Sequence, residues 1–273
     1  MGVLALLFVV VSYYPLFKIV PLVASLELFS FFSFHLLARR SRLQLQGFLG
    51  GFISSTAVYL QTLNDIRFDK VPANELLLTL LWALCAMLLE CLFILFFLTK
   101  LFSFEFYLPF IIQLAFFVSV IFLIKMTGPS NDSVEEQLDY DLDNNLLLDR
   151  PIIWWNVVKL SFYIFALIWL MNFVANDIGF SRNISTLIVS LFEAHAILAS
   201  VLTDWSLQPD NIDVMTLIFL ILLGNTLSKS IFVLRGRNLV KKWNFIGVLF
   251  AGLAISVVIT FICINDTRQL FQF

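Results

Sequence analysis

The feature that most constrains this chain is a series of long apolar stretches, each close to the length that a helix needs to cross a lipid bilayer. Hydrophobic residues make up 60% of the 273 residues and charged residues only 13%, whereas soluble domains carry roughly 45–50% apolar and about 25% charged residues. About 20 consecutive apolar residues span the hydrocarbon core as a helix. The stretches are too long and alternate too little for barrel strands. We therefore expect an all-α, polytopic membrane helix bundle.

Breaks between the apolar stretches predict about nine helices. Prolines, glycines and short charged runs separate the stretches, for example at Arg39–Arg42 and Arg235–Arg237. The expected helices cover residues 2–16, 19–38, 43–63, 73–99, 103–125, 152–175, 181–203, 212–234 and 241–264. Residues 126–150 differ because they are rich in Asp and Glu. Burying so many carboxylates is costly, so this segment is predicted to be a solvated linker.

Two polar clusters inside apolar helices indicate an internal repeat. The first cluster is Gly50–Ala57 and the second is Ser190–Ala196. An offset of 139 residues, the separation of Gly51 from Ser190, also places Thr56 on His195 and Glu90 on Lys229, and it maps four helices onto four. The expected domains are an extra N-terminal helix at 1–18, membrane repeat 1 at 19–125, the acidic linker at 126–150 and membrane repeat 2 at 151–265.

The path of the two cluster-bearing helices decides how the repeats are oriented. If the helices at 43–63 and 181–203 span the membrane, the repeats are parallel; if they are re-entrant, the repeats are inverted. The inverted arrangement collects more Lys and Arg residues on one side, as the positive-inside rule favours. Both arrangements place Arg39–Arg42 and Arg235–Lys242 in the cytoplasm. The sequence leaves the two arrangements open.

Polar side chains within the apolar helices form the candidate site. Ionisable groups are expensive in hydrocarbon and usually mark function. Glu193 could carry a proton or bind a cation, His195 titrates near neutral pH, and an acid is expected to pair with Lys229. The two clusters, Asn225 and Lys229 are expected to meet near the middle of the membrane. The full set of candidate substrate- or ion-binding residues is Ser54, Ser55, Thr56, Glu90, Lys159, Glu193, His195, Asn225 and Lys229.

Structural roles explain several of these residues equally well. Small residues allow two helices to approach closely, and in the first cluster and just before it these are Gly47, Gly50, Gly51, Ser54, Ser55 and Thr56. Lys159 can extend its ammonium group toward the membrane surface from a helix end. Asn225 and Lys229 lie one turn apart and could clasp neighbouring helices. A functional and a purely structural interpretation of the polar set therefore both stand.

Other classes of function find little support in the sequence. His35 and His195 are the only histidines, and no nucleophile elbow, phosphate loop or metalloprotease motif occurs. Cys85, Cys91 and Cys263 show no metal-binding or redox spacing. The net charge of −2 gives no electrostatic footprint for nucleic acid. We expect no enzymatic activity, no cofactor and no nucleic-acid partner, while metal binding stays open.

The residue pattern also resembles a known family. The runs that carry the resemblance are Leu36–Arg40, Gly47–Ala57, Val158–Leu160 and Asn225–Lys229. They are similar to those of the bacterial membrane domain of unknown function that often follows an MgtC/SapB domain. The family typically carries paired Asp residues where this chain has Glu193 and His195, and a basic residue where it has Glu90. The resemblance implies a polytopic membrane fold and no established activity.

Two functions from different classes follow from the sequence. The first is a small-solute or ion transporter with a polar site between two repeats, as is common in transporters with internal repeats. The second is a non-transporting scaffold or regulatory module for a partner protein. Beyond the lipid bilayer, the expected partners are a small solute or ion, a second copy of the chain, or a partner membrane protein. The expected location is a multi-pass position in the bacterial inner membrane.

Overall fold

The computed structural model describes residues 43–64, 71–98, 104–127, 182–191, 194–195, 197–198, 211–236 and 242–270. The regular structure in these ranges is helical throughout, with no strand. The helices are α3 (Leu43–Asn64), α4 (Ala73–Leu98), the 3-10 turn η3 (Phe104–Phe106), α5 (Leu108–Thr127), α8 (Arg182–Ser190), α10 (Asn211–Arg235) and α11 (Lys242–Leu270). The helices expected at 2–16, 19–38 and 152–175, and all of the acidic linker beyond Thr127, lie outside the described residues.

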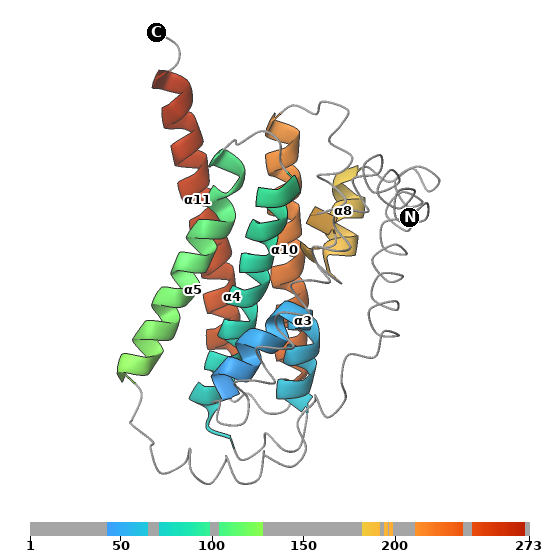
Figure 1. The fold of residues 1–273 in the computed structure, drawn as a ribbon, viewed down its shortest axis with the longest axis vertical. Coiled ribbons are helices and arrows are strands. Elements are labelled where there is room, and N and C mark those ends of the chain that lie inside the picture. The colour runs from blue at the N-terminus through green and yellow to red at the C-terminus, as the bar shows by residue number, and fades with distance from the viewer. Residues whose placement is uncertain are drawn as a thin grey trace, which may run out of the picture.

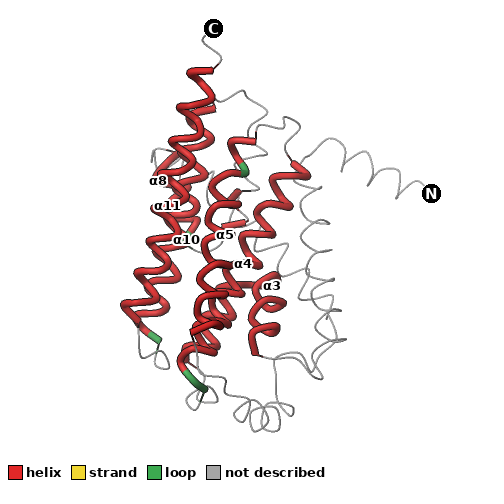
Figure 2. Tube along the Cα trace, turned by 90° about the vertical axis from the view of Figure 1, so that its left-hand side faces the viewer, coloured by secondary structure: helices red, strands yellow, loops and turns green. Residues whose placement is uncertain are grey.

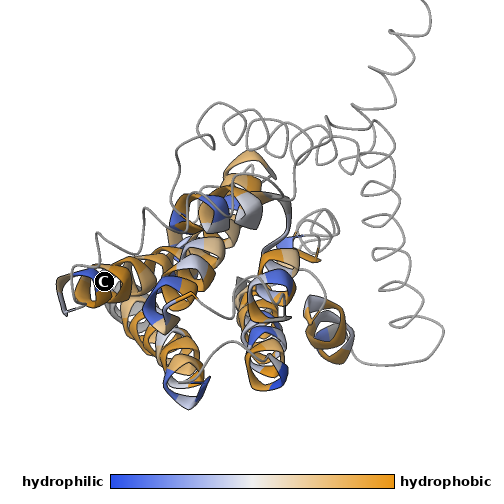
Figure 3. Ribbon diagram, turned by 90° about the horizontal axis from the view of Figure 1, so that it is seen from below, coloured by the Kyte–Doolittle hydropathy of each residue, from blue (hydrophilic) through white to orange (hydrophobic). Residues whose placement is uncertain are grey.

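Four of the described helices are long and apolar enough to cross a membrane. They cover Ala73–Phe97, Phe104–Thr127, Val214–Arg235 and Lys242–Cys263. Large apolar side chains lie exposed on their outer faces, among them Phe97, Phe122 and Phe261. Such side chains favour lipid over water, and Figure 3 shows apolar residues along every helix of the bundle. The protein is therefore a membrane protein, as its composition predicted.

The four long helices stand side by side and alternate in direction (Figure 1). In the view of Figure 1, α4 and α11 run upward along the chain, whereas α5 and α10 run downward. α4 packs against α5, α5 against α11, and α11 against α10. The two remaining elements, α3 and α8, pack against α4 and α10 respectively. Figure 2 shows the same bundle from the side.

Helix α3 is broken at Ser54, inside the first polar cluster. The backbone of Ser54 is extended, with φ −166° and ψ 108°. Its side-chain Oγ accepts a hydrogen bond from the backbone N–H of Ala57 at 3.2 Å, so that Ser54 caps the helix that restarts after it. Serine suits this position because its hydroxyl replaces a missing helical partner. The polar cluster therefore marks a helix break, which divides α3 into two halves.

The two halves of α3 run in opposite directions. The first half follows α4, because Gln44 Nε2 donates to Glu75 Oε2 at 2.9 Å and Gly51 packs on Ala83. The second half follows α10, with Leu63 packed on Gly236. Since α4 and α10 run in opposite directions, α3 turns back inside the bundle, and both of its ends lie at the lower end in Figure 1. A helix that turns back in this way matches the re-entrant alternative for residues 43–63, and its sidedness in the membrane stays a prediction.

The single helix expected over residues 181–203 is also broken. α8 ends at Ser190, where the N–H of Leu191 turns back to the carbonyl of Ile188 at 3.3 Å. The hydroxyl of Ser190 donates to the Leu187 carbonyl at 2.8 Å and lies 3.4 Å from the Leu220 carbonyl of α10. Serine thus satisfies carbonyl groups at the helix end, which is why the helix can stop inside an apolar bundle. Ala194 and His195 are again helical.

Small residues let the broken helices approach their neighbours closely. A Cβ atom added at Gly51 would lie 2.7 Å from Ala83 Cα, and one at Gly47 would lie 2.5 Å from the Thr79 carbonyl oxygen. In the other half, a Cβ atom at Gly224 would collide with Ser190 Oγ. These distances are shorter than carbon atoms tolerate. The close-packing role that the sequence allowed for Gly47 and Gly51 is therefore real.

We expect Gly51→Ala to lower the melting temperature of the purified protein by about 5 °C or more, since the clash is with backbone that cannot move aside. The matched control is Gly247→Ala in α11, because nothing lies within 4 Å of a Cβ atom at that position. There, alanine should leave the protein unchanged or slightly stabilise it. Thermal unfolding in detergent measures both variants, and equal effects would contradict close packing at Gly51.

Candidate functional site

The ammonium group of Lys229 lies against the second half of α3. Lys229 Nζ donates a hydrogen bond to Thr56 Oγ1 at 2.6 Å, and it lies 5.4 Å from the centre of the Tyr59 ring. Only 2% of Lys229 is exposed. A hydroxyl oxygen and an aromatic face are both favourable neighbours for a desolvated cation. This contact links α10 to the helix that begins at the break in α3.

A second buried contact joins Glu90 of α4 to His195. Glu90 Oε2 lies 3.6 Å from His195 Nδ1, and the two side chains are 1% and 5% exposed. His195 belongs to the helical residues that follow the end of α8. The distance suits an ion pair between a carboxylate and a protonated imidazole. The contact therefore changes character with the protonation of the histidine.

The contact between Thr56 and Lys229 and the contact between Glu90 and His195 are related by the offset of 139 residues. This offset places Thr56 on His195 and Glu90 on Lys229. The contact between Thr56 and Lys229 thus corresponds to the contact between His195 and Glu90, with the two halves of the chain exchanged. Exchanged contacts of this kind are what a two-fold relation between two similar units produces.

The two contacts approach the middle of the bundle from opposite ends. Glu90 lies beyond the midpoint of the span Ala73–Phe97, and Lys229 lies beyond the midpoint of the span Val214–Arg235. The two helices run in opposite directions (Figure 1). Side chains lean toward the N-terminus of their own helix, so Glu90 and Lys229 both lean back toward the middle. The acid and the base therefore flank one central region.

The remaining predicted site residues are placed as follows. Ser54 caps the second half of α3, and Ser55 is buried beside it. Asn225 is buried one turn before Lys229 on α10. Lys159 and Glu193 lie outside the described residues. The structure thus brings Thr56 to Lys229 and Glu90 to His195.

Tyr59 is a site residue that sequence reasoning missed. It is fully buried, its ring lies under the Lys229 ammonium group, and it packs against Phe245 of α11 with ring centres 6.3 Å apart. Its hydroxyl has no hydrogen-bond partner among the described residues. The only signal in the sequence was its spacing, since Tyr59 follows Thr56 by about one helical turn.

Other buried hydroxyl groups on α10 are satisfied by their own helix. Thr226 Oγ1 donates to the Leu222 carbonyl at 2.8 Å, and Ser230 Oγ donates to the Thr226 carbonyl at 2.7 Å. Such bonds are the usual way to place Ser and Thr in an apolar helix. The hydroxyl protons of these two residues are therefore used within α10.

The charged groups of the buried site are few. Among the described residues, Glu90 is the buried acid, Lys229 the buried base and His195 the buried histidine. The described residues contain no group of three or more His, Cys, Asp or Glu side chains that could hold a metal ion. The site offers fixed charges of both signs, one titratable imidazole and several hydroxyl groups. An imidazole can take up a proton, and hydroxyl groups can form hydrogen bonds with polar groups.

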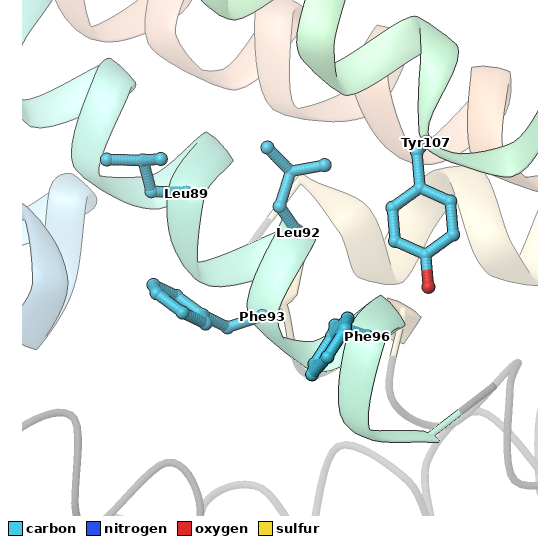
Figure 4. A pocket seen from close by; sticks show the side chains of 5 residues that line it. All are labelled: Leu89, Leu92, Phe93, Phe96 and Tyr107. Atoms are coloured by element: carbon cyan, nitrogen blue, oxygen red, sulfur yellow. The ribbon is translucent and has the colours of Figure 1, made fainter. Parts of the chain in front are cut away.

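A shallow groove on the outside of the bundle has a different character. It is lined by Leu89, Leu92, Phe93 and Phe96 of α4 and by Tyr107 (Figure 4). The lining is almost wholly hydrocarbon, and Phe93 and Phe96 are exposed. A polar solute would lose its hydration there without finding partners. The groove therefore offers an apolar surface, on which hydrocarbon is a more favourable neighbour than a polar group.

Comparison with protein families places these elements in a known group. The family model described as a domain of unknown function, DUF4010, matches residues 22–236. The chain belongs to the DUF4010 family. The DUF4010 match runs from before α3 to the end of α10 and includes Thr56, Glu90, His195 and Lys229, so the predicted family resemblance is confirmed. No curated protein and no solved structure shows a detectable match to the chain.

Proposed function

We propose that this protein transports a small solute or an ion through a polar site between two inverted repeats. The observation that carries the proposal is the exchanged pair of contacts, Thr56 with Lys229 and His195 with Glu90. Each contact joins one expected repeat to the other. Transporters built from inverted repeats place their sites at that interface, near the membrane midplane.

The helix directions support an inverted relation between the repeats. The offset pairs α4 with α10 and α5 with α11, and each pair runs in opposite directions in Figure 1. α3 reaches the centre from the lower end, and α8 lies along the half of α10 that is nearer the upper end. Broken helices that meet inside a bundle are a recurrent device for binding solutes, because backbone freed from helical bonding can face a cavity.

Charges at the ends of the helices support an orientation in a bacterial inner membrane. Lys125 lies in the last turn of α5, Arg235 ends α10 and Lys242 begins α11, and these three helix ends all point to the lower end in Figure 1. The positive-inside rule assigns such an end to the cytoplasm. We therefore propose a multi-pass arrangement in which α3 enters from the cytoplasmic side and α8 from the opposite side.

Transport is tested by charge movement in proteoliposomes on a solid-supported membrane. The probes are amino acids, small carboxylates, inorganic anions, and monovalent and divalent cations, each added at millimolar concentration to the purified protein. We expect at least one probe to produce a current that saturates with concentration. If no probe gives a current or accumulates in the vesicles, although the protein is folded, the scaffold or regulatory role is favoured instead.

We expect Thr56→Val to reduce the solute-induced current about tenfold or more, since the near-isosteric valine removes the hydroxyl that holds Lys229 Nζ. Thr56→Ser keeps the hydroxyl and should retain most of the current. Ser119→Ala is the control for a lost hydroxyl, because Ser119 is exposed on α5 and bonds only the Ala115 carbonyl of its own helix. A normal current in Thr56→Val would remove this residue from the site.

A further inference from the structure

We propose that Glu90 and His195 together form a proton-binding site, and that the bound proton is the ion coupled to transport. The second part of this proposal rests on the transport function proposed above. The geometry consists of a carboxylate oxygen and an imidazole nitrogen 3.6 Å apart, both almost completely buried. Histidine is the side chain whose ordinary titration lies near physiological pH, and an adjacent carboxylate stabilises its charged form.

The buried charges give the proton a defined effect. Among the described residues, Glu90 and Lys229 can balance each other as one buried negative and one buried positive charge. Neutral His195 leaves that balance unchanged. A proton on His195 turns its contact with Glu90 into an ion pair and adds one positive charge to the interior. Because charges interact strongly away from water, this single event changes the energy of the whole site.

The position of the contact explains how a proton could act on the conformation. Glu90 belongs to α4, whereas His195 belongs to the residues after α8, which packs on α10. The contact therefore crosses between the two halves of the chain. If the halves move relative to each other during transport, a stronger ion pair holds them together and a weaker contact releases them. Protonation of histidine at an interface is an established kind of switch.

The other titratable groups that are buried, among the residues the structure describes, are Lys229 of α10, Tyr59 of α3, and Cys85 and Cys91 of α4 itself. The buried residues of α5 include no titratable group. Glu193, two residues before His195, lies outside the described residues. Experiments on the pair must therefore separate Glu90 from Lys229 and from Glu193.

The chain offers a direct spectroscopic test, because it contains only two histidines. The full-length His35→Gln protein, labelled with ¹⁵N-histidine and held in lipid nanodiscs, reports on the ring of His195 alone. We expect its ¹⁵N signals to change as the pH of the sample is varied, because the ring gains or loses a proton. In Glu90→Gln, the midpoint should move down by about one pH unit or more, since the stabilising carboxylate is gone. Glu193→Gln should move it less.

Two further variants keep the test decisive. Glu75→Gln is the matched control, because Glu75 lies at the start of the same helix and bonds Gln44 rather than His195; the midpoint should stay where it was. Glu90→Asp keeps the carboxylate but shortens the side chain, and it serves as the second variant if Glu90→Gln fails to fold. Its midpoint should lie below that of the parent protein, and above that of Glu90→Gln where both fold. A His195 signal that does not change with pH, or a midpoint that is the same in every Glu90 variant, overturns the proton site.

Coupling is tested separately from proton binding. In proteoliposomes, the solute-induced current of the parent protein should change severalfold across the pH range in which His195 titrates, and this pH dependence should flatten in Glu90→Gln. A current that ignores pH while His195 titrates overturns the coupling. A titrating His195 in a protein that moves no solute overturns the proposed transport function instead, since the spectroscopic result needs no transport.

Discussion

Replacing Lys229 by methionine should destabilise the protein more than either Gly51→Ala or Thr56→Val. Lys229 is 2% exposed, and it is the buried base among the described residues. Methionine fills similar space but removes the buried positive charge and its hydrogen bond to Thr56 Oγ1. Removing one partner from a set of buried charges typically costs about 3–5 kcal/mol. We expect Lys229→Met to unfold well below the parent protein, or to be recovered poorly from the membrane.

The double variant Lys229→Met with Glu90→Gln distinguishes charge balance from lost packing. If the imbalance of charge causes the damage, removing the acid as well should restore at least about half of the lost melting temperature. Lys125→Met is the control, because Lys125 is exposed at the end of α5 and only its ammonium group approaches the Trp82 ring, at 5.9 Å. Its loss should cost about 1 kcal/mol or less. Equal damage in Lys125→Met and Lys229→Met would contradict a balanced buried site.

The extent of most described helices followed from the sequence, whereas the path of α3 did not. Apolar length alone located both ends of α4 and α10 and the start of α11 to within one residue, whereas α11 continues to Leu270, beyond the expected end at 264. A helix is the arrangement that satisfies the backbone of such stretches in lipid. Gly50–Ala57 fits both a tight helix contact and a helix break. The break at Ser54 depends on packing against α4 before it and α10 after it, and neighbours of this kind are set by the tertiary fold.

For the buried charges, too, the sequence identified the residues but not their contacts. Sequence reasoning identified Glu90, His195, Thr56 and Lys229 as polar groups in apolar helices, and it expected an acid to pair with Lys229. The structure places Lys229 on Thr56 and Glu90 beside His195. Helix order along the chain does not reveal which helices face each other across a bundle. The offset of 139 residues maps one contact onto the other, as the proposed two-fold relation between the halves would require.

Membrane topology gives an all-or-none test of the re-entrant α3 and of the inverted arrangement built on it. Single cysteines at Leu43, Asn74, Asn183 and Trp243 are labelled with an impermeant maleimide, in intact spheroplasts and in inverted vesicles. Cys263 is replaced by serine, whereas Cys85 and Cys91 are buried and stay. If α3 turns back, Leu43 and Asn74 label from the same side. The inverted arrangement further places Trp243 with them and Asn183 on the opposite side.

The alternative predicts a different result at two of the four positions. If residues 43–63 and 181–203 span the membrane, Asn74 moves to the side opposite Leu43 and Trp243, and Asn183 moves to the same side as those two. Leu43 and Trp243 therefore serve as internal references, while Asn74 and Asn183 exchange sides between the two arrangements. Asn74, Asn183 and Trp243 are exposed, so failure to react would reflect sidedness rather than burial. Labelling of Asn74 from the side opposite Leu43 would contradict the turn at Ser54 and, with it, the two-fold relation that brings the charged contacts together.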